Sequence, residues 1–223
     1  MEVKNLNELQ KATLQIKGLP SLAKKEAKYI KFQQGDYLCK EEESMDYLLF
    51  MVSGRAKVSI TAANGRTLLL NFYGEGGVLG DVEMMLSRGL GTTNVVAITQ
   101  VECIGLPVSY CKSILSSDIE FMNFIAKNLA KKLNSSSRNS AMNLLYSLEN
   151  RLCAYIEATE EQGKFSENLT EIAELLGTSY RHLLRTLKDL CELGIIERYS
   201  RTKYRIKDIE KLRENAAECF IIY

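Results

Sequence analysis

The residues best suited to chemistry gather in one stretch near the C-terminus. It contains His182, the only histidine among 223 residues, next to Arg181. From Ser179 to Lys207 there are eight Lys/Arg and three Asp/Glu, although the net charge of the whole chain is only +1. A local excess of positive charge on a near-neutral chain predicts one domain that meets a polyanion.

The spacing of these basic residues predicts how they are presented. Arg181, Arg185 and Lys188 lie at i, i+4 and i+7, so on a helix they share one face, opposite the leucines of the same segment. The planar fork of arginine can donate two hydrogen bonds to O6 and N7 of guanine. Ser179 and the backbone N–H groups near it can bind phosphate. On charge alone, a solvated basic face without a partner remains an alternative.

The elements around the stripe are typical of a winged helix-turn-helix. Asn168, with Glu171 three residues later, is a capping-box arrangement at a helix start, and Gly177 ends that helix. A second helix follows and stops at Gly194, after which alternating residues predict a small hairpin. We expect the second helix to enter the major groove of DNA with its N-terminal residues. The predicted DNA contacts are Asn168, Thr170, Ser179, Tyr180, Arg181, His182, Arg185, Lys188, Arg201 and Lys203.

Catalysis and metal binding find no support in the sequence. His182 has no histidine partner, so we interpret it as a contact to a base or a phosphate, with a solvent-exposed residue as the alternative. No two of the six cysteines have C-x-x-C spacing, and buried, reduced thiols are expected. No G-x-S-x-G, P-loop or paired-carboxylate motif is present, so the chain is not expected to be an enzyme.

The N-terminal half reads as short strands. Residues 27–110 contain apolar or alternating runs of strand length, separated by Gly-rich turns such as GEGGVLG. Asn64-Gly65 lies between two of these runs and predicts a type I′ hairpin turn, which needs φ > 0 at both central residues. Short strands at near-regular spacing indicate an all-β barrel or roll.

A long helix is predicted between the two parts. Residues 118–149 contain no Gly or Pro, and apolar residues recur every four positions from Phe121 to Leu133 and again at Leu144 and Leu148. Such a helix has more apolar surface than a small domain can cover, which predicts pairing with a second copy. The polar middle, LNSSSRNSAMN, weakens a pure coiled-coil interpretation: either the helix breaks there or the serines face something polar.

These observations together predict an α+β chain of three parts. They are a β-roll domain over 1–117, to which the family resemblance given below assigns a sensor role, a central dimerisation helix over 118–149 and a winged helix-turn-helix over 150–223. The polar N-terminus indicates no signal peptide and no run is long enough to span a membrane, so a cytoplasmic protein is expected.

This order of parts resembles the cyclic-AMP receptor protein/FNR (Crp/Fnr) family of transcription regulators over about residues 29–207. TEIAELLGTSYRHLLRTLKDL is similar to the recognition unit of that family, and GEGGVLGDVEMM to its cyclic-nucleotide-binding-like effector loop. The resemblance implies double-stranded DNA as partner, a homodimer, a small-molecule effector and contact with RNA polymerase. The effector itself is unknown from the sequence.

Carrying the family's effector residues over shows a departure. Asp81 stands where cyclic-AMP-responsive members have a Glu for the ribose, Thr92 where they have a Ser for the phosphate, and Gly91 where they have an Arg. Because the countercharge of the phosphate is missing, the resemblance implies weak or no cyclic-AMP binding. Ser136 and Ser137 match the positions that reach the purine. The implied pocket is Gly80, Asp81, Val82, Glu83, Gly91, Thr92, Thr93, Ser136 and Ser137.

Two alternatives stay open at this point. The FNR branch holds an iron–sulfur centre with an N-terminal cysteine cluster, which this chain lacks, yet a sensor built from its scattered thiols is conceivable. A ligand-sensing module whose helix-turn-helix contacts protein is the other. On the recognition helix, the resemblance assigns the first three contact positions to Tyr180, Arg181 and His182 and the guanine-reading arginine to Arg185.

Overall fold

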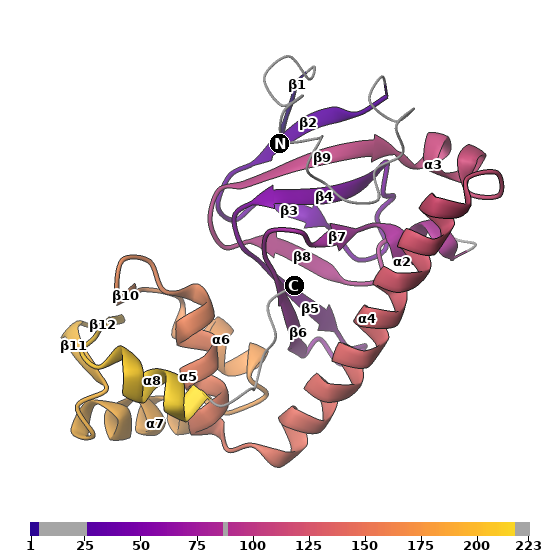
Figure 1. The fold of residues 1–223 in the computed structure, drawn as a ribbon. Coiled ribbons are helices and arrows are strands. Elements are labelled where there is room, and N and C mark those ends of the chain that lie inside the picture. Colours follow the sequence, from indigo (N-terminus) through magenta and orange to yellow (C-terminus); the bar gives the residue numbers. More distant parts are fainter. Residues whose placement is uncertain (5–25, 87–88, 217–223) are drawn as a thin grey trace. The chain divides into compact units, whose positions relative to one another are not determined.

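A computed structural model describes residues 1–4, 26–86 and 89–216 (Figure 1). The N-terminal part is a roll of two antiparallel sheets, as the strand-length runs predict. The first sheet has the order β1 (Glu2–Lys4), β2 (Lys28–Phe32), β9 (Val101–Pro107), β4 (Tyr47–Ser53) and β7 (Val78–Leu79). The second has the order β3 (Tyr37–Cys39), β8 (Asn94–Ala97), β5 (Ala56–Thr61) and β6 (Thr67–Tyr73).

The core of the roll is built on the β4–β9 pair. Leu48 lies opposite Leu106, and Phe50 lies opposite Ile104 in the ladder. All four are fully or almost fully buried. They pack with Phe121 and other apolar residues at the start of the central helix, so the first turns of that helix belong to the core of the roll.

The hairpin between β5 and β6 lies where the sequence predicts it but has another turn type. Gly65 has a φ of 78°, but Asn64 does not have a positive φ. The predicted type I′ turn is therefore wrong. Gly65 N donates to Ala62 O at 2.8 Å, and Ala62 N donates to Arg66 O at 2.8 Å. The loop therefore holds three residues and needs positive φ only at its glycine.

The central helix is shorter than predicted. α4 spans Ile119–Leu145, and Ser147 then caps a separate helix, α5 (Leu148–Thr159), by accepting a hydrogen bond from Asn150 N. The helix expected over 118–149 is thus two helices, and the break comes after the serines, not among them. Leu148 is buried in α5 and does not continue the stripe of α4.

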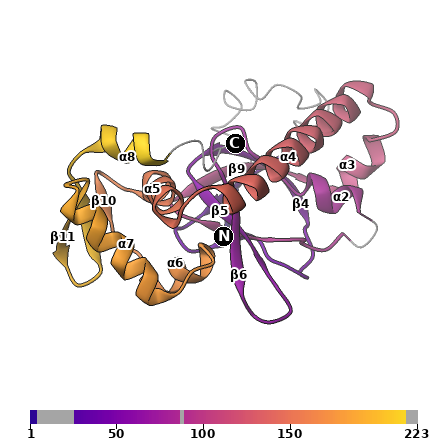
Figure 2. The same ribbon diagram turned by 90° about the horizontal axis from the view of Figure 1, so that it is seen from below.

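The C-terminal part is helical with a small sheet (Figure 2). Its elements are α5, β10 (Lys164–Phe165), α6 (Leu169–Leu175), α7 (Tyr180–Glu192), β11 (Ile196–Ser200), β12 (Lys203–Ile206) and α8 (Ile209–Ala216). The predicted hairpin is β11–β12, and β10 adds a third strand beside β12. The fold class expected from the sequence, a β-roll, a long helix and a winged helix-turn-helix, is confirmed.

Some short elements carry no sequence signal. The strands β3 and β7 and the helices α2 (Asp81–Met85) and α3 (Val108–Ile114) are too short for a periodicity to show. The chain divides into two compact units. The first comprises Met1–Ile60 and Phe72–Ser136, and the second comprises Thr61–Asn71 and the chain from Ser137 on. Among the described residues, no helix is long and apolar enough to cross a membrane.

Candidate DNA-binding surface and effector pocket

The second helix of the helix-turn-helix presents the predicted basic stripe to solvent. Leu183, Leu187 and Leu190 of α7 are at most 1% exposed, and they anchor the helix in its domain. Arg181 and Arg185 lie on the exposed side of the same helix, as the spacing predicts. Neither arginine has an ion-pair partner among the described residues, so both guanidinium groups are available to a ligand.

Local capping fixes where α6 and α7 begin. The side chain of Asn168 accepts a hydrogen bond from Thr170 N, and the side chain of Ser179 accepts one from His182 N. The predicted N-cap at Asn168 is therefore confirmed, and Ser179 caps the second helix. Gly177, with a φ of 63°, makes the turn between the two helices, because that backbone conformation strains residues with a Cβ.

His182 is an exposed residue at the start of α7. Its ring Nδ1 lies 3.3 Å from Thr178 Oγ1, a contact within the turn. No group of three or more His, Cys, Asp or Glu that could hold a metal occurs in the part of the chain that the structure describes. The geometry leaves Nε2 for an outside partner, so a role in DNA contact stays a prediction.

Residues from three elements meet in a hollow beside α7. The volume of this hollow is about 510 Å³. It joins the start of α6, the first residue of α7 and the tip of the wing: Ser166, Glu167, Asn168, Leu169, Thr170, Tyr180, Arg201 and Thr202 line it. The structure thus brings together four of the predicted DNA contacts that are far apart in the sequence, namely Asn168, Thr170, Tyr180 and Arg201.

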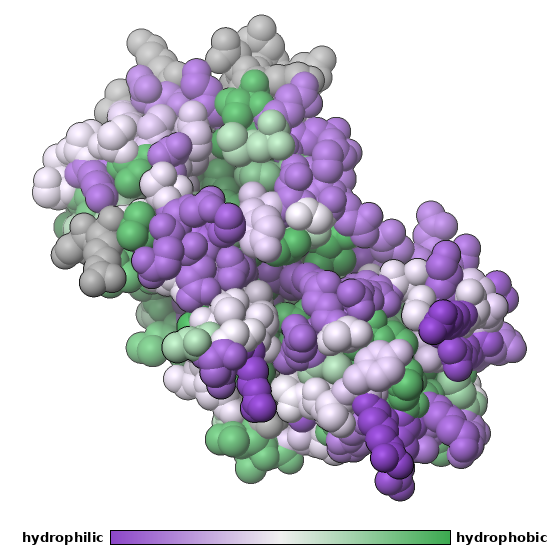
Figure 3. Space-filling view, turned by 180° about the vertical axis from the view of Figure 1, so that it is seen from behind, coloured by the Kyte–Doolittle hydropathy of each residue, from purple (hydrophilic) through white to green (hydrophobic). Residues whose placement is uncertain are grey.

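Two basic residues of α7 and the wing, Lys188 and Arg205, interact with neighbouring side chains of this chain. Lys188 lies 3.3 Å from Glu192 on the surface of α7, so part of its charge is neutralised. Arg205 in β12 lies over the ring of Tyr199 at 5.6 Å, which stiffens the wing. Strongly hydrophilic residues cover much of this C-terminal part in Figure 3.

The predicted effector pocket contains a buried ion pair that the sequence analysis missed. The ammonium of Lys132, on α4, contacts Oδ1 of Asp81, the first residue of α2. The side chain of Asp81 is 0% exposed and that of Lys132 is 19% exposed. Lys132 also lies 5.3 Å from the ring centroid of Tyr73. One sequence signal could have indicated this ion pair. Lys132 comes seven residues after Ile125 and four after Asn128, so it lies on the face of α4 that packs on the roll.

The pKa values in this cluster follow from burial and from the ion pair. Burial alone opposes the charged form of Lys132, but Tyr73 and Asp81 outweigh it, so the pKa of Lys132 lies above its ordinary value. Burial raises the pKa of Tyr73, although Lys132 works in the opposite direction. Both groups therefore keep their protons at neutral pH.

Glu83, the next acidic residue of α2, is 6% exposed and has its own partner. Its Oε1 accepts two hydrogen bonds from Thr92, one from the backbone N at 3.2 Å and one from Oγ1 at 2.6 Å. Gly91 next to it has no room for a side chain, because a Cβ would lie 2.2 Å from the carbonyl oxygen of Lys40. The arginine that cyclic-AMP-responsive members have at this position could not stand here.

The serines in the middle of α4 differ in exposure. Ser136 and Ser137 are exposed in the single chain, whereas Ser135 is 5% exposed. Ser135 lies three residues after Lys132, so it shares the face of α4 that meets the roll. Ligand contacts of Ser136 and Ser137 stay predictions.

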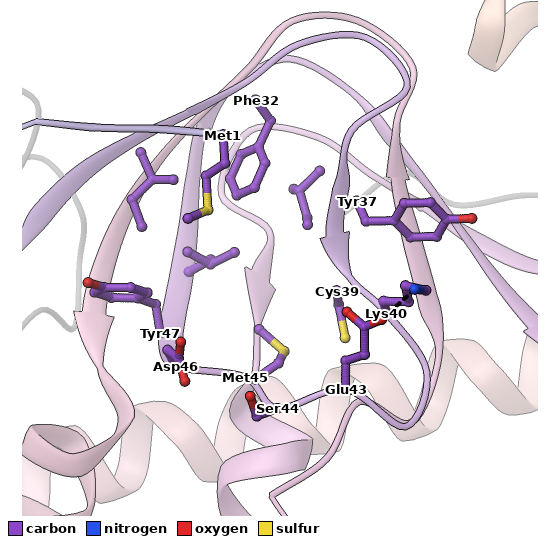
Figure 4. Close-up of a pocket in the computed structure, with 13 residues that line it drawn as sticks. Met1, Phe32, Tyr37, Cys39, Lys40, Glu43, Ser44, Met45, Asp46 and Tyr47 are labelled. Atoms are coloured by element: carbon purple, nitrogen blue, oxygen red, sulfur yellow. Dashed lines mark hydrogen bonds and ion pairs between the residues drawn. The ribbon is translucent and has the colours of Figure 1, made fainter.

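A separate hollow of about 240 Å³ lies inside the roll, between β2, β3 and β4 (Figure 4). Apolar side chains and the sulfur atoms of Cys39 and Met45 line it, with the Lys40–Glu43 ion pair at its side. The residues predicted for the effector pocket do not line this hollow.

The cysteines match the expected buried thiols in most cases. Cys39, Cys103, Cys111 and Cys153 are buried, and Cys191 is half-buried. Burial raises the pKa of Cys39, Cys103 and Cys111 to about 12. Cys219 lies outside the described residues.

Comparisons with known proteins agree with this geometry. The cyclic nucleotide-binding domain matches residues 29–118, and the Crp-like helix-turn-helix domain matches residues 144–215. A crp/fnr-family protein of known structure from Eubacterium rectale has a TM-score of 0.76 at 18% identity, over 96% of this chain and 99% of that one. The chain belongs to the Crp/Fnr family, a family of transcription regulators and not a class of enzymes.

Within the family, the stretches SYRHLL and LGDVE indicate a YeiL-type regulator. Regulatory protein YeiL of Escherichia coli O157:H7 is 30% identical over 187 residues, which are 84% of this chain and 84% of that protein. A CRP-like cAMP-activated global transcriptional regulator of Mycobacterium tuberculosis is 25% identical over 202 residues, or 86% of this chain and 89% of that protein.

Proposed function

We propose that this chain is a homodimeric, sequence-specific regulator that places α7 in the major groove of an inverted-repeat operator. The observation that carries the proposal is the unpaired, exposed Arg181–Arg185 stripe on a helix anchored by buried leucines. Arg185 would donate to a guanine in each half-site, and the hollow formed by the start of α6, Tyr180 and the wing would receive the phosphate backbone.

A heptad stripe on α4 supports the dimer. Ile119, Leu133 and Leu144 are exposed by 75%, 70% and 86%, and they lie 14 and 11 residues apart. The residues that continue this stripe between them are mostly small, and successive members lie alternately four and three residues apart on the exposed side of α4. That stripe is Ile119, Asn123, Ala126, Ala130, Leu133, Ser137, Ser140 and Leu144. A 3.5-residue repeat with small side chains fits close parallel pairing of two helices.

The apolar stripe expected from the sequence does not lie on one face of α4. Phe121 and Ile125 face the roll and are buried, whereas Leu133 faces away. Positions four apart drift by about 40° at each step on a helix of 3.6 residues per turn, so the predicted row crosses from one face to the other. A hydrophobic patch is visible where α4 ends (Figure 3), at Leu144 and Leu145.

The effector is proposed to be a molecule other than cyclic AMP. The absent arginine at Gly91 and the internal partners of Asp81 and Glu83 support this. A thiol-based sensor gains no support from Cys39, Cys103 and Cys111, because they are buried and burial raises the pKa of each thiol. Contact with RNA polymerase stays a prediction.

Selection of bound duplexes from a random DNA library by the purified, reduced protein tests this function. We expect an inverted repeat with a guanine in each half, about one helical turn between half-site centres. If nothing is recovered, the selection is repeated with cell extract. Failure there too, together with a stable protein partner, would replace DNA binding with a protein-contact function.

A further inference from the structure

The roll fills its own effector pocket with an acidic side chain. Glu83 is almost completely buried, and Thr92 directs two donors, a backbone N–H and a hydroxyl, at the same carboxylate oxygen. Two converging donors of this kind make a cradle for an anion. Glu83 and Thr92 are nine residues apart, so the chain folds back to supply its own anion to this cradle.

The backbone closes the cradle on another side. Gly91 N donates to Glu43 O at 2.8 Å, and Glu42 N donates to Gly91 O at 2.9 Å. This pairing brings the carbonyl oxygen of Lys40 to 2.2 Å from where a Cβ of residue 91 would lie. A cationic side chain that could attract an incoming anion therefore cannot stand beside Thr92 without a shift of the backbone.

Lys132, the cation closest to these groups, is already paired with Asp81. Lys132 contacts Oδ1 of Asp81, and Asp81 is 0% exposed. Asp81, Glu83 and Lys132 together carry two carboxylates and one ammonium, a net charge of one negative. Both Asp81 and Glu83 act electrostatically on Tyr73, which shows that they share one environment. In such a buried site the net charge repels an anion more strongly than it would in water.

The cluster still has capacity for a hydrogen-bond donor. Oδ2 of Asp81 is buried and has no partner among the residues that the structure describes. A buried, unsatisfied acceptor is costly and favours any ligand that donates to it.

We propose that Glu83 sets the charge selectivity of this pocket: its carboxylate is a tethered anion that occupies the Thr92 cradle and excludes phosphate-bearing effectors. The effectors that remain are neutral or cationic hydrogen-bond donors. This inference deepens the proposed function and rests on it, because it assigns the effector class of the same roll.

The variant Glu83→Ala tests the tethered anion, since it removes the carboxylate and leaves both donors of Thr92 in place. Inorganic phosphate is the probe, compared with sodium chloride at equal ionic strength, and the readout is the Tm of the full chain. We expect phosphate to raise the Tm of the variant by about 3 °C and to leave the wild type unchanged. Glu75→Ala, an exposed acidic residue of the same roll, is the matched control and should behave as the wild type.

Two further variants keep the test decisive. Glu83→Ala with Thr92→Val lacks the hydroxyl donor and should lose the gain. Glu83→Gln preserves the shape of the side chain; should Glu83→Ala not fold, this variant shows the same direction with a smaller shift. Equilibrium dialysis with cyclic AMP is a second readout, in which Glu83→Ala should bind at least tenfold more tightly than the wild type.

The proposal is overturned if phosphate stabilises the wild type and Glu83→Ala equally, or if it stabilises neither Glu83 variant. The DNA selection described above uses the wild type without phosphate and therefore reports separately on the regulator function. If the DNA selection fails, the pocket no longer has a regulator function to control. The phosphate-dependent Tm would still show whether Glu83 excludes anions from it.

Discussion

At the scale of single residues, the predicted DNA contacts on α7 and on the wing divide into two kinds. Arg185 lies on the exposed face of α7 near the expected base edges, whereas Lys203 lies on the wing. We expect Arg185→Ala to relax discrimination at one base pair and to cost about 1–3 kcal/mol on the selected operator.

Lys203→Ala is the matched counterpart of that change. A phosphate contact carries no sequence information, so this variant should weaken specific and nonspecific duplexes alike and reduce the salt slope by about 1. Titrations of both variants against the operator and a scrambled duplex, at several salt concentrations, provide the measurement. Operator discrimination that survives Arg185→Ala would show that another residue reads the guanine.

The buried thiols lead to a second prediction at this scale. Burial raises the pKa of Cys39 to about 12, with Glu83 adding to it, and burial also raises the pKa of Cys103 and Cys111 to about 12. At pH 8 only about one such thiol in ten thousand is a thiolate, the reactive form. We expect these three cysteines to resist a disulfide reagent in the folded chain and to react at once in urea. Their rapid modification in the native state, found by peptide mapping, would revive a thiol sensor.

The sequence could predict the exposed basic face of α7 better than the contacts within the predicted effector pocket. The stripe of α7 depends on helix periodicity within a few turns, which is local information. The pocket depends on residues such as Asp81, Thr92 and Lys132, which come together only after the roll closes and α4 packs on it. Lys132 was missed for that reason, as were the hydrogen bonds from Thr92 to Glu83.

At the scale of elements, the long strands and helices follow from their patterns and the boundaries follow from capping. The Asn168 and Ser179 caps were predictable because each is a short-range hydrogen bond. The turn type at Asn64-Gly65 was not, because two- and three-residue hairpin loops share the same glycine signal. The sequence pattern placed buried and exposed residues of α4 in one stripe, because a row of every fourth residue drifts around the helix.

The exposed heptad stripe of α4 gives the prediction at this scale. Leu133 is 70% exposed at the middle of the stripe, so its removal should leave the fold of the single chain intact. We expect Leu133→Lys to raise the dimer dissociation constant at least tenfold, because a charge at a core position of a helix pair has no partner in the interface.

Sedimentation equilibrium measures this dissociation constant, and circular dichroism confirms that the helix content is unchanged. Lys131→Glu is the control, since Lys131 is exposed on α4 but lies farther around the helix from the stripe. It should leave the dimer as it is. Equal dimerisation of all three proteins would exclude the heptad stripe as the interface.

At the scale of the whole molecule, buried proton-binding groups make stability depend on alkaline pH. Burial raises the pKa of Tyr73, and burial followed by Glu167 raises the pKa of Tyr155. The pKa of Lys132 is also raised, because Tyr73 and Asp81 outweigh the opposing effect of burial. In all three cases the folded state holds a proton that the unfolded chain releases near pH 10.

The sign follows from that difference. A group whose pKa is higher in the folded state stabilises the fold fully below its unfolded pKa, and the contribution is lost as the pH rises toward the folded value. We therefore expect the free energy of unfolding, from urea titrations, to begin to fall above about pH 8.5, where the unfolded chain releases the thiol protons of Cys39, Cys103 and Cys111. Above about pH 10 the tyrosines and Lys132 add to this, and the slope exceeds ~1.4 kcal/mol per pH unit, the slope for one proton.

Tyr73→Phe should reduce that slope by about one proton, because it removes one of the coupled groups while keeping an apolar ring in the roll. Tyr180→Phe changes an exposed tyrosine of α7 and should leave the slope unaltered. If the wild type keeps its full stability at pH 11, or if both variants have the same slope, then the Tyr73–Lys132–Asp81 cluster does not hold its protons as tightly as its burial requires. The contact between α4 and the roll would in that case rest on apolar packing by Phe121, Phe124, Ile125 and Leu129.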